Sequence, residues 1–99
     1  MKVGATQYRK RDLAHAFGAA LRAARVERGI SQDTLSELCD FDRTYPSLLE
    51  RGLRSPTLAM VFRIADALEV EPAVLVAGAR TKLQELVSAQ GGGCPSRPG

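Results

Sequence analysis

The sequence is poor in the residues from which metal sites, disulfide frameworks and most catalytic centres are built. Its 99 residues include one histidine, two cysteines, no tryptophan, two tyrosines and three phenylalanines. A zinc site needs four ligands at paired short spacings, which His15, Cys39 and Cys94 do not supply. The sequence also offers no nucleophile beside a base. We therefore expect no metal, no cofactor and no enzymatic activity.

Long apolar runs are missing as well. No stretch approaches the roughly 18 apolar residues that a membrane-spanning helix requires. The charges near the N-terminus are not followed by the apolar segment of a signal peptide. With 44% hydrophobic and 25% charged residues, the chain has enough apolar side chains for one core and an ordinary charged surface. We expect a single-domain cytoplasmic protein.

The net charge is only +3, and it is distributed unevenly along the chain. Residues 1–28 contain seven lysines and arginines against two acidic residues, whereas residues 31–54 contain three arginines against five acidic residues. We interpret residues 1–11 as a flexible basic segment, which is either a solvated, partly disordered terminus or an arm that follows the DNA backbone or enters the minor groove. Other phosphate contacts would have to come from a few individual arginines and from backbone N–H groups.

Abundant alanine, leucine and arginine, with few β-branched runs, predict an all-α protein. A first helix is expected from Asp12, as its N-cap, to about Arg28, with Gly29 ending it. The Ser55–Thr57 segment offers a cap for a fourth helix, and Glu71–Pro72 opens a fifth. The spacing of apolar residues predicts three buried stripes: Leu13, Phe17, Leu21 and Ala24; Leu58, Val61, Phe62, Ala65 and Leu68; and Val74, Leu75 and Val76.

Residues 31–52 read as two short helices joined by a tight turn. Ser31 is expected to cap a helix over residues 32–39. The turn that follows begins at Asp40 and continues into an apolar residue that fills the space where the helices cross. The inward face of this helix is predicted to carry Leu35, Leu38 and Cys39.

The helix after the turn is predicted over residues 43–51, with Asp42 as its cap and Gly52 as its end. Pro46 near its start predicts a loosened or slightly bent first turn. Two helices joined by such a turn have the helix-turn-helix shape, in which the second helix enters the DNA major groove.

Residues 12–78 are thus predicted to form the helix-turn-helix domain. The segment 79–90 is expected to be helical, with Leu83, Leu86 and Val87 aligned on one face. It can serve as a dimer surface or lie loosely against the domain as a tail. Residues 91–99 are rich in glycine and proline and are expected to be disordered.

Arg25 lies one turn beyond Leu21 and is therefore expected to point toward the edge of the core, where a partly buried arginine needs a carboxylate partner. Between about Leu21 and Val76, the sequence resembles the Cro/CI-type (XRE-like) helix-turn-helix family. The matching signals are Arg25, Gly29–Gln32, Leu35, Asp42–Thr44, Glu50–Gly52, Ser55–Thr57, Ala67–Leu68 and Glu71–Pro72. The Asp-Arg-Thr-Tyr run at 42–45 looks most like the small controller proteins of restriction–modification systems. Asp40 and Pro46 depart from the family, which usually has glycine and a β-branched residue there.

The resemblance implies a compact five-helix, lambda-repressor-like domain with a possible C-terminal helical extension. It implies a sequence-specific transcriptional regulator of the repressor type that binds double-stranded DNA as a homodimer on a roughly palindromic operator. The dimer contact would come from the fifth helix and the 79–90 segment. The implied base-reading residues are Arg43, Thr44, Ser47 and Leu48; the implied backbone contact is Gln32; and the implied structural ion pair is Arg25 with Glu50. Arg51 and Arg54 are further candidates for contacts to the DNA backbone.

A second interpretation is a protein-interaction module of the same fold, such as an antitoxin or an anti-activator. The apolar segment 79–90, which would bind the partner, and the net acidic charge of residues 31–54 favour it.

Overall fold

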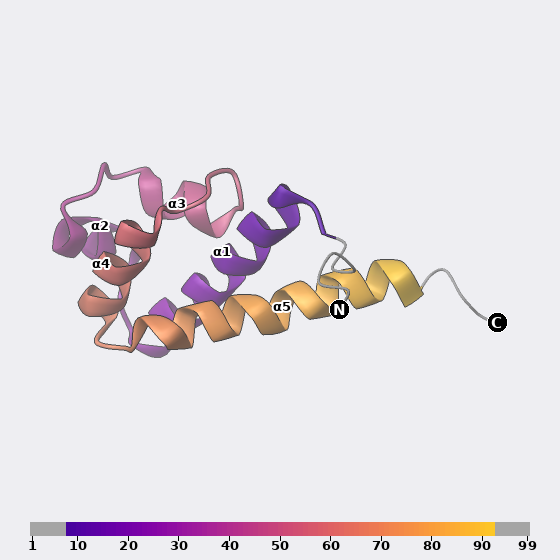
Figure 1. The fold of residues 1–99 in the computed structure, drawn as a ribbon. Coiled ribbons are helices and arrows are strands. Elements are labelled where there is room, and N and C mark those ends of the chain that lie inside the picture. Colours follow the sequence, from indigo (N-terminus) through magenta and orange to yellow (C-terminus); the bar gives the residue numbers. More distant parts are fainter. Residues whose placement is uncertain (1–7, 93–99) are drawn as a thin grey trace.

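The computed structural model describes residues 8–92, which form five helices and, within that range, no strand. The all-α prediction is therefore confirmed. In chain order the helices are α1 (Lys10–Glu27), α2 (Gln32–Cys39), α3 (Tyr45–Glu50), α4 (Leu58–Leu68) and α5 (Pro72–Gly92) (Figure 1). Most of the predicted arm at 1–11 and of the predicted tail at 91–99 lies outside the described residues, but residues 10–11 and 91–92 are helical rather than flexible.

One hydrophobic core joins all five helices. The long helices α1 and α5 pack against each other, and α2, α3 and α4 gather at one end of the pair (Figure 1). The largest completely buried side chains are Leu21, Leu35, Pro46, Leu49, Ile64, Leu68 and Leu75. Within the described range, no helix combines the length and hydropathy needed to cross a membrane.

The ends of α2 follow the predicted local rules. Ser31 precedes α2, and its hydroxyl accepts a hydrogen bond of 3.0 Å from the Thr34 N–H. After α2, Asp40 adopts the left-handed conformation (φ 57°) that the family usually assigns to glycine. Asparagine and aspartate tolerate this conformation better than most residues because their short polar side chains can bond locally. The predicted bounds of this helix and its turn are confirmed.

Two predicted helix starts are wrong. Asp12 is not the N-cap of α1 but its third residue, and its carboxylate accepts a hydrogen bond of 3.2 Å from the Arg9 N–H. α3 begins at Tyr45 rather than at 43, because Asp42 bonds to Thr44 in a turn that precedes the helix. Pro46 therefore lies in the first turn of α3, where its missing N–H breaks no helical bond.

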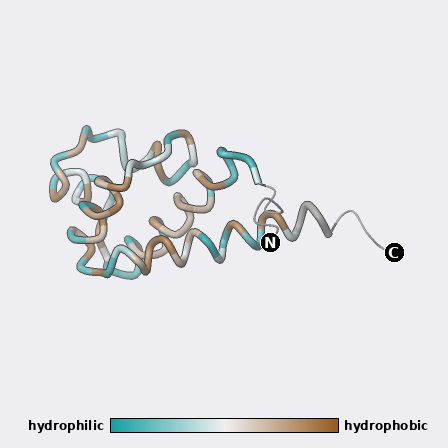
Figure 2. The backbone as a smooth tube through the Cα atoms, in the orientation of Figure 1, coloured by the Kyte–Doolittle hydropathy of each residue, from teal (hydrophilic) through white to brown (hydrophobic). Residues whose placement is uncertain are grey.

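The predicted buried stripes are only partly correct. Leu21, Val61, Leu68 and Leu75 are buried, but Leu13, Leu38, Leu58, Phe62, Val74 and Val76 are 40% to 70% exposed. The spacing of apolar residues shows that a helix has an apolar face, but not which part of that face the neighbouring helices cover. In α4 the buried residue is Ile64, whereas Phe62 is exposed. Figure 2 shows hydrophobic residues recurring along α4 and α5.

The predicted boundary at residue 78 lies inside one helix, because α5 continues unbroken to Gly92. Gly78 lies against α1, where an added Cβ would be 3.1 Å from the Cβ of Ala20. Beyond it, Ala79 and Leu83 are buried. The segment 79–90 is therefore the second half of α5, and at least its first turns belong to the core.

Candidate nucleic-acid interface

A largely buried ion pair fixes α3 to α1. Arg25 donates from Nε to Glu50 Oε2 at 2.6 Å and from Nη2 to Glu50 Oε1 at 3.0 Å. The two side chains are only 13% and 5% exposed. Hydrogen bonding to Glu50 raises the pKa of Arg25 more than burial lowers it, so the guanidinium stays charged. The structure thus brings together the two residues of the ion pair that the resemblance implies.

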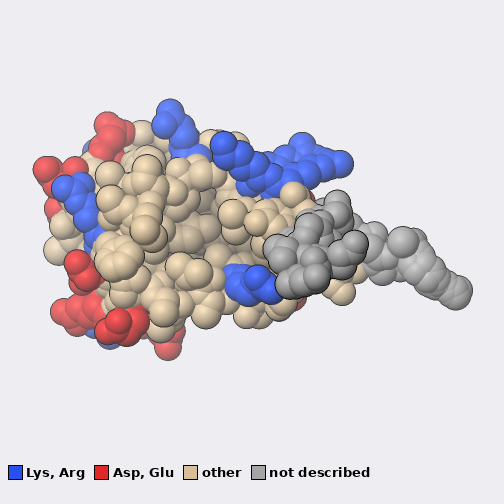
Figure 3. All heavy atoms as spheres, in the orientation of Figure 1, with Lys and Arg blue, Asp and Glu red and all other residues tan. Residues whose placement is uncertain are grey.

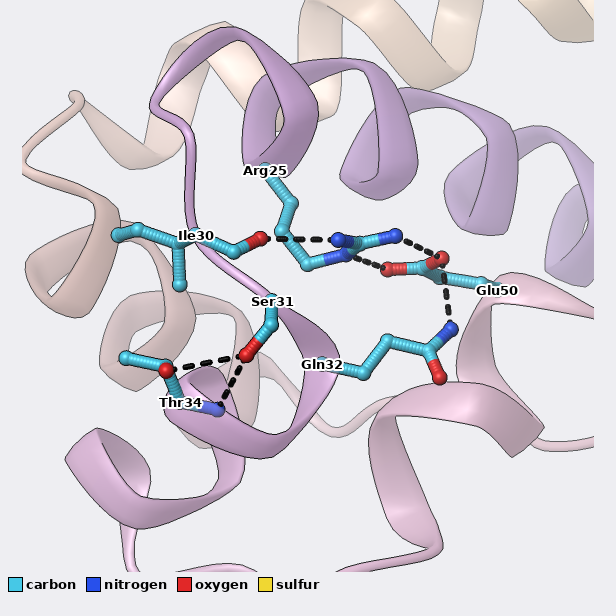
Figure 4. A network of polar contacts seen from close by, with 6 residues as sticks. All are labelled: Arg25, Ile30, Ser31, Gln32, Thr34 and Glu50. Atoms are coloured by element: carbon cyan, nitrogen blue, oxygen red, sulfur yellow. Dashed lines mark hydrogen bonds and ion pairs between the residues drawn. The ribbon is translucent and has the colours of Figure 1, made fainter.

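The same ion pair also reaches α2. Arg25 Nη1 donates to the Ile30 carbonyl at 2.8 Å, and Gln32 Nε2 donates to Glu50 Oε1 at 3.0 Å (Figure 4). Gln32, the predicted phosphate ligand, is therefore half-buried and bonded within the protein. Its amide nitrogen carries a second N–H. We call the network of Arg25, Glu50, Gln32 and the Ile30 carbonyl the helix joint, because it ties α1, α2 and α3 together.

Gly18 lets the backbones of α1 and α3 approach directly. A Cβ at this position would lie 2.3 Å from the Leu49 carbonyl oxygen and 2.7 Å from that of Glu50. Sequence reasoning assigned no role to Gly18. The available signal was a glycine in the middle of a helix, which costs roughly 1 kcal/mol relative to alanine and therefore suggests a packing requirement.

Two of the predicted base-reading residues, Arg43 and Thr44, lie in the turn before α3, and the other two, Ser47 and Leu48, lie within the helix. Arg43 and Thr44 are exposed, and Ser47 and Leu48 are half-buried. Asp42 accepts hydrogen bonds from the Thr44 N–H (3.0 Å) and the Thr44 hydroxyl, which fixes the backbone around Arg43. These bonds, from the hydroxyl first and then the N–H, lower the pKa of Asp42. The chain thus enters α3 through a hydrogen-bonded turn.

Arg43 is paired with Asp33, a residue in the first turn of α2 that the sequence analysis did not select. Arg43 Nε lies 3.3 Å from Asp33 Oδ1, and Arg43 Nη2 lies 3.1 Å from Asp33 Oδ2. The side chains are 80% and 60% exposed. The pair joins two residues that are ten positions apart, so no helical spacing in the sequence signals it.

Arg51 and Arg54 are exposed in the loop that follows α3. Gly52 lies against His15, since a Cβ there would be 2.6 Å from His15 Nδ1. This packing holds the loop beside the first half of α1, where Lys10 and Arg11 are also exposed. Figure 3 shows lysines and arginines along the edge over α3 and the start of α1, whereas acidic residues gather at the end formed by α2 and α4.

A wide apolar groove runs between α1, α4 and α5. It has a volume of about 1010 Å³. Its apolar lining includes Tyr8, Leu13, Phe17, Leu58, Val61, Val76, Leu83 and Val87, and Arg80 and Gln84 contribute polar groups. Leu58 and Val76 are 70% and 52% exposed, so the described chain leaves apolar surface uncovered along this groove. The phosphate-contacting and base-reading candidates all lie outside its lining.

Comparisons with known proteins identify the family and the fold. A family model described as helix-turn-helix matches residues 21–75. The control protein C.BamHI of Bacillus amyloliquefaciens is 40% identical over 57 residues, which are 57% of this chain and 70% of that protein. The crystal structure of the restriction-modification controller protein C.AhdI from Aeromonas hydrophila is 40% identical, with a TM-score of 0.61 over 63% of this chain and 94% of that one.

A further solved structure contains DNA. The restriction-modification controller protein C.Esp1396I, crystallised as a tetramer in complex with its natural 35-base-pair operator, is 28% identical to this chain. The two align with a TM-score of 0.64, over 72% of this chain and 93% of that one.

Proposed function

This chain belongs to the helix-turn-helix family of DNA-binding transcriptional regulators, and we propose that it acts as a homodimer that reads the major groove of a roughly palindromic operator. The similarity to restriction–modification controllers, one of which was solved on its operator, supports the choice of double-stranded DNA as the ligand.

The exposed start of α3 carries the proposal. Arg43 and Thr44 lie in the turn that Asp42 closes, and Ser47 and Leu48 follow within α3, the helix that the helix joint holds. An arginine is long enough to donate two bonds to guanine O6 and N7, and the methyl groups of Thr44 and Leu48 suit the thymine methyl. Because burial holds Glu50 and Arg25 in place, α3 keeps a fixed position while its outer residues meet base edges.

Backbone contacts would flank this reading surface. Arg51 and Arg54 extend from the loop after α3, and the Gln32 amide has one N–H left beside the N-terminus of α2. Such contacts orient the protein on the duplex without reading its sequence. Lys10 and Arg11, the first two residues of α1, continue the positive edge and are further candidates for contacts to the DNA backbone.

The apolar groove is the proposed dimer surface. Exposed apolar residues on α4 and α5, including Leu58 and Val76, would be covered by a second copy. A two-fold dimer places its reading elements about 34 Å apart, one turn of DNA, which is why a palindromic operator is expected. Replacing Leu58 by aspartate should give a monomer in sedimentation equilibrium and weaken binding to a palindromic site.

Leu38 provides a matched control, because it is 57% exposed on α2 and does not line the groove. Leu38→Asp should leave the dimer intact. Point variants are preferable to removing residues 79–99, since that truncation would also remove the buried Ala79 and Leu83. A wild-type monomer, or an intact dimer in Leu58→Asp, would contradict the proposed dimer surface.

In-vitro selection from random duplex DNA tests the function itself. We expect a palindromic site to be enriched, with an affinity that falls steeply as salt rises because phosphate contacts release counterions. If no site is enriched, the same groove favours the second interpretation, a module that binds another protein. A pull-down with the Leu58→Asp and Leu38→Asp variants would then show whether a partner depends on the groove.

A further inference from the structure

The Asp33–Arg43 pair occupies only one edge of the guanidinium. The bonds to Asp33 come from Nε and Nη2, at 3.3 Å and 3.1 Å. A guanidinium has five N–H donors in a planar fork, so the terminal edge formed by Nη1 and Nη2 stays open. That terminal edge is able to donate two parallel bonds to the O6 and N7 atoms of a guanine. The carboxylate and a base can therefore bind Arg43 at the same time.

We propose that Asp33 is a positioning residue for base recognition, which holds Arg43 so that its terminal edge meets guanine. This inference rests on the proposed function. A free arginine side chain loses rotamer entropy when it is fixed on a base. The pairing with Asp33 fixes part of the side chain before DNA arrives, which reduces the loss at binding.

The anchor on α2 is itself well ordered. Asp33 follows the Ser31 cap, and the Ser36 hydroxyl donates to the Asp33 carbonyl at 2.7 Å. Arg43 is held from the other side by the Asp42–Thr44 turn. The pair thus spans the two halves of the helix-turn-helix unit, and its effect should be on recognition rather than on folding, since both side chains are largely exposed.

Asp33 also places a negative charge near the DNA backbone, and this gives the inference a distinctive signature. Removing that charge reduces repulsion with every duplex, specific or not. Loss of the carboxylate should therefore raise the affinity for random DNA while it lowers discrimination at the guanine that Arg43 reads. If Asp33 instead held Arg43 away from DNA, its removal would raise operator affinity with discrimination unchanged or improved.

The experiment compares wild type, Asp33→Ala, Glu37→Ala, Arg43→Ala and the double variant Asp33→Ala/Arg43→Ala. Glu37 is the control, an exposed acid one turn farther along α2, whereas the described partner of Arg43 is Asp33. Each protein is titrated with two duplexes. The first is the site selected by the wild-type protein, and the second differs from it at the one base pair for which Arg43→Ala has lost the preference. Thermal melts confirm that the variants are folded.

Wild-type discrimination at that base pair is expected to be roughly 5- to 150-fold. Asp33→Ala should reduce it by about 3- to 10-fold, a coupling typical of contacting residues, whereas Glu37→Ala should keep the wild-type ratio. In the Arg43→Ala background, removing Asp33 should leave discrimination unchanged. If Asp33→Ala keeps the wild-type discrimination between the two duplexes, or if Glu37→Ala loses as much of it, the proposed role of Asp33 is wrong. Neither result would contradict the proposed function. A wild-type protein without any preferred site would overturn the proposed function and this inference with it.

Discussion

Two arginines of this protein each form a two-bond pair with a carboxylate, and the two pairs differ mainly in burial. Arg25 and Glu50 are 13% and 5% exposed, at the centre of the helix joint. Arg43 and Asp33 are 80% and 60% exposed, at the start of α3. Burial makes the first pair a constraint on where α3 lies, because neither charge can be left alone in the interior. Because the second pair is exposed, it has little effect on stability. Its arginine, Arg43, also keeps the N–H groups of its terminal edge open to a ligand.

The largest expected effect comes from breaking the buried pair. Glu50→Ala leaves the Arg25 guanidinium with no carboxylate and should lower the free energy of unfolding by roughly 3–5 kcal/mol. Asp33→Ala is the matched control, since it removes the carboxylate of the exposed pair, and it should cost no more than about 1 kcal/mol. Urea denaturation of both variants measures the difference, and similar losses in the two would remove the distinction between the pairs.

A second test shifts α3 relative to α1 without changing the charged residues of the helix joint. Gly18→Ala places a methyl group against the carbonyl oxygens of Leu49 and Glu50, so α3 has to shift. We expect a loss of about 1–3 kcal/mol of stability, together with weaker binding to the selected operator, measured by fluorescence anisotropy. Gly78→Ala is the control, because its Cβ meets only the Ala20 side chain, at the contact of α5 with α1. Equal operator affinity for wild type and Gly18→Ala would show that α3 is not positioned by this contact.

A third test separates phosphate contacts from base contacts. Arg54→Ala should weaken binding to all duplexes alike and reduce the slope of log affinity against log salt by about 1. Arg28→Ala removes the same charge at a different place, where Arg28 pairs with Glu69 beyond the end of α4, and should leave the slope unchanged. A change of base preference in Arg54→Ala would instead assign Arg54 to the reading surface.

The smallest expected effect concerns the turn before α3. Because Thr44 donates to Asp42, the pKa of Asp42 is lower in the folded state than in the unfolded chain. The turn therefore stabilises the fold at pH values above the unfolded pKa, and this contribution is lost as the pH falls through the folded one. Carboxyl NMR titration should give Asp42 a midpoint below the ordinary aspartate value, and Thr44→Val should move that midpoint back up. An ordinary midpoint in the wild type would mean that the turn is open in solution.

Local rules predicted much of the fold. The Ser31 cap, the turn at Asp40 and the bounds of α2 depend on residues within one or two turns of each other, so the sequence is sufficient. The resemblance to restriction–modification controllers, which the Asp-Arg-Thr-Tyr run at 42–45 carried, is confirmed in family and in fold. The predicted start of α3 is wrong because Asp42 can cap a helix or close a turn before it, and in the structure it closes the turn.

The features that the sequence did not reveal depend on tertiary packing. The exposure of Leu58 and Phe62 is set by how α4 is rotated against its neighbours, which apolar spacing alone leaves open. Gly18 matters because of a backbone that is distant in sequence. The Asp33–Arg43 pair joins residues that meet only after the helix-turn-helix unit has formed.

The most direct test of the account is in-vitro selection from random duplex DNA with wild type and Arg43→Ala in parallel. We expect a palindromic site for the wild type, with half-sites one helical turn apart, and the loss of preference at one guanine in each half-site for Arg43→Ala. No enriched site for the wild type, or the same site at full strength for the variant, would contradict the assignment of recognition to the exposed pair.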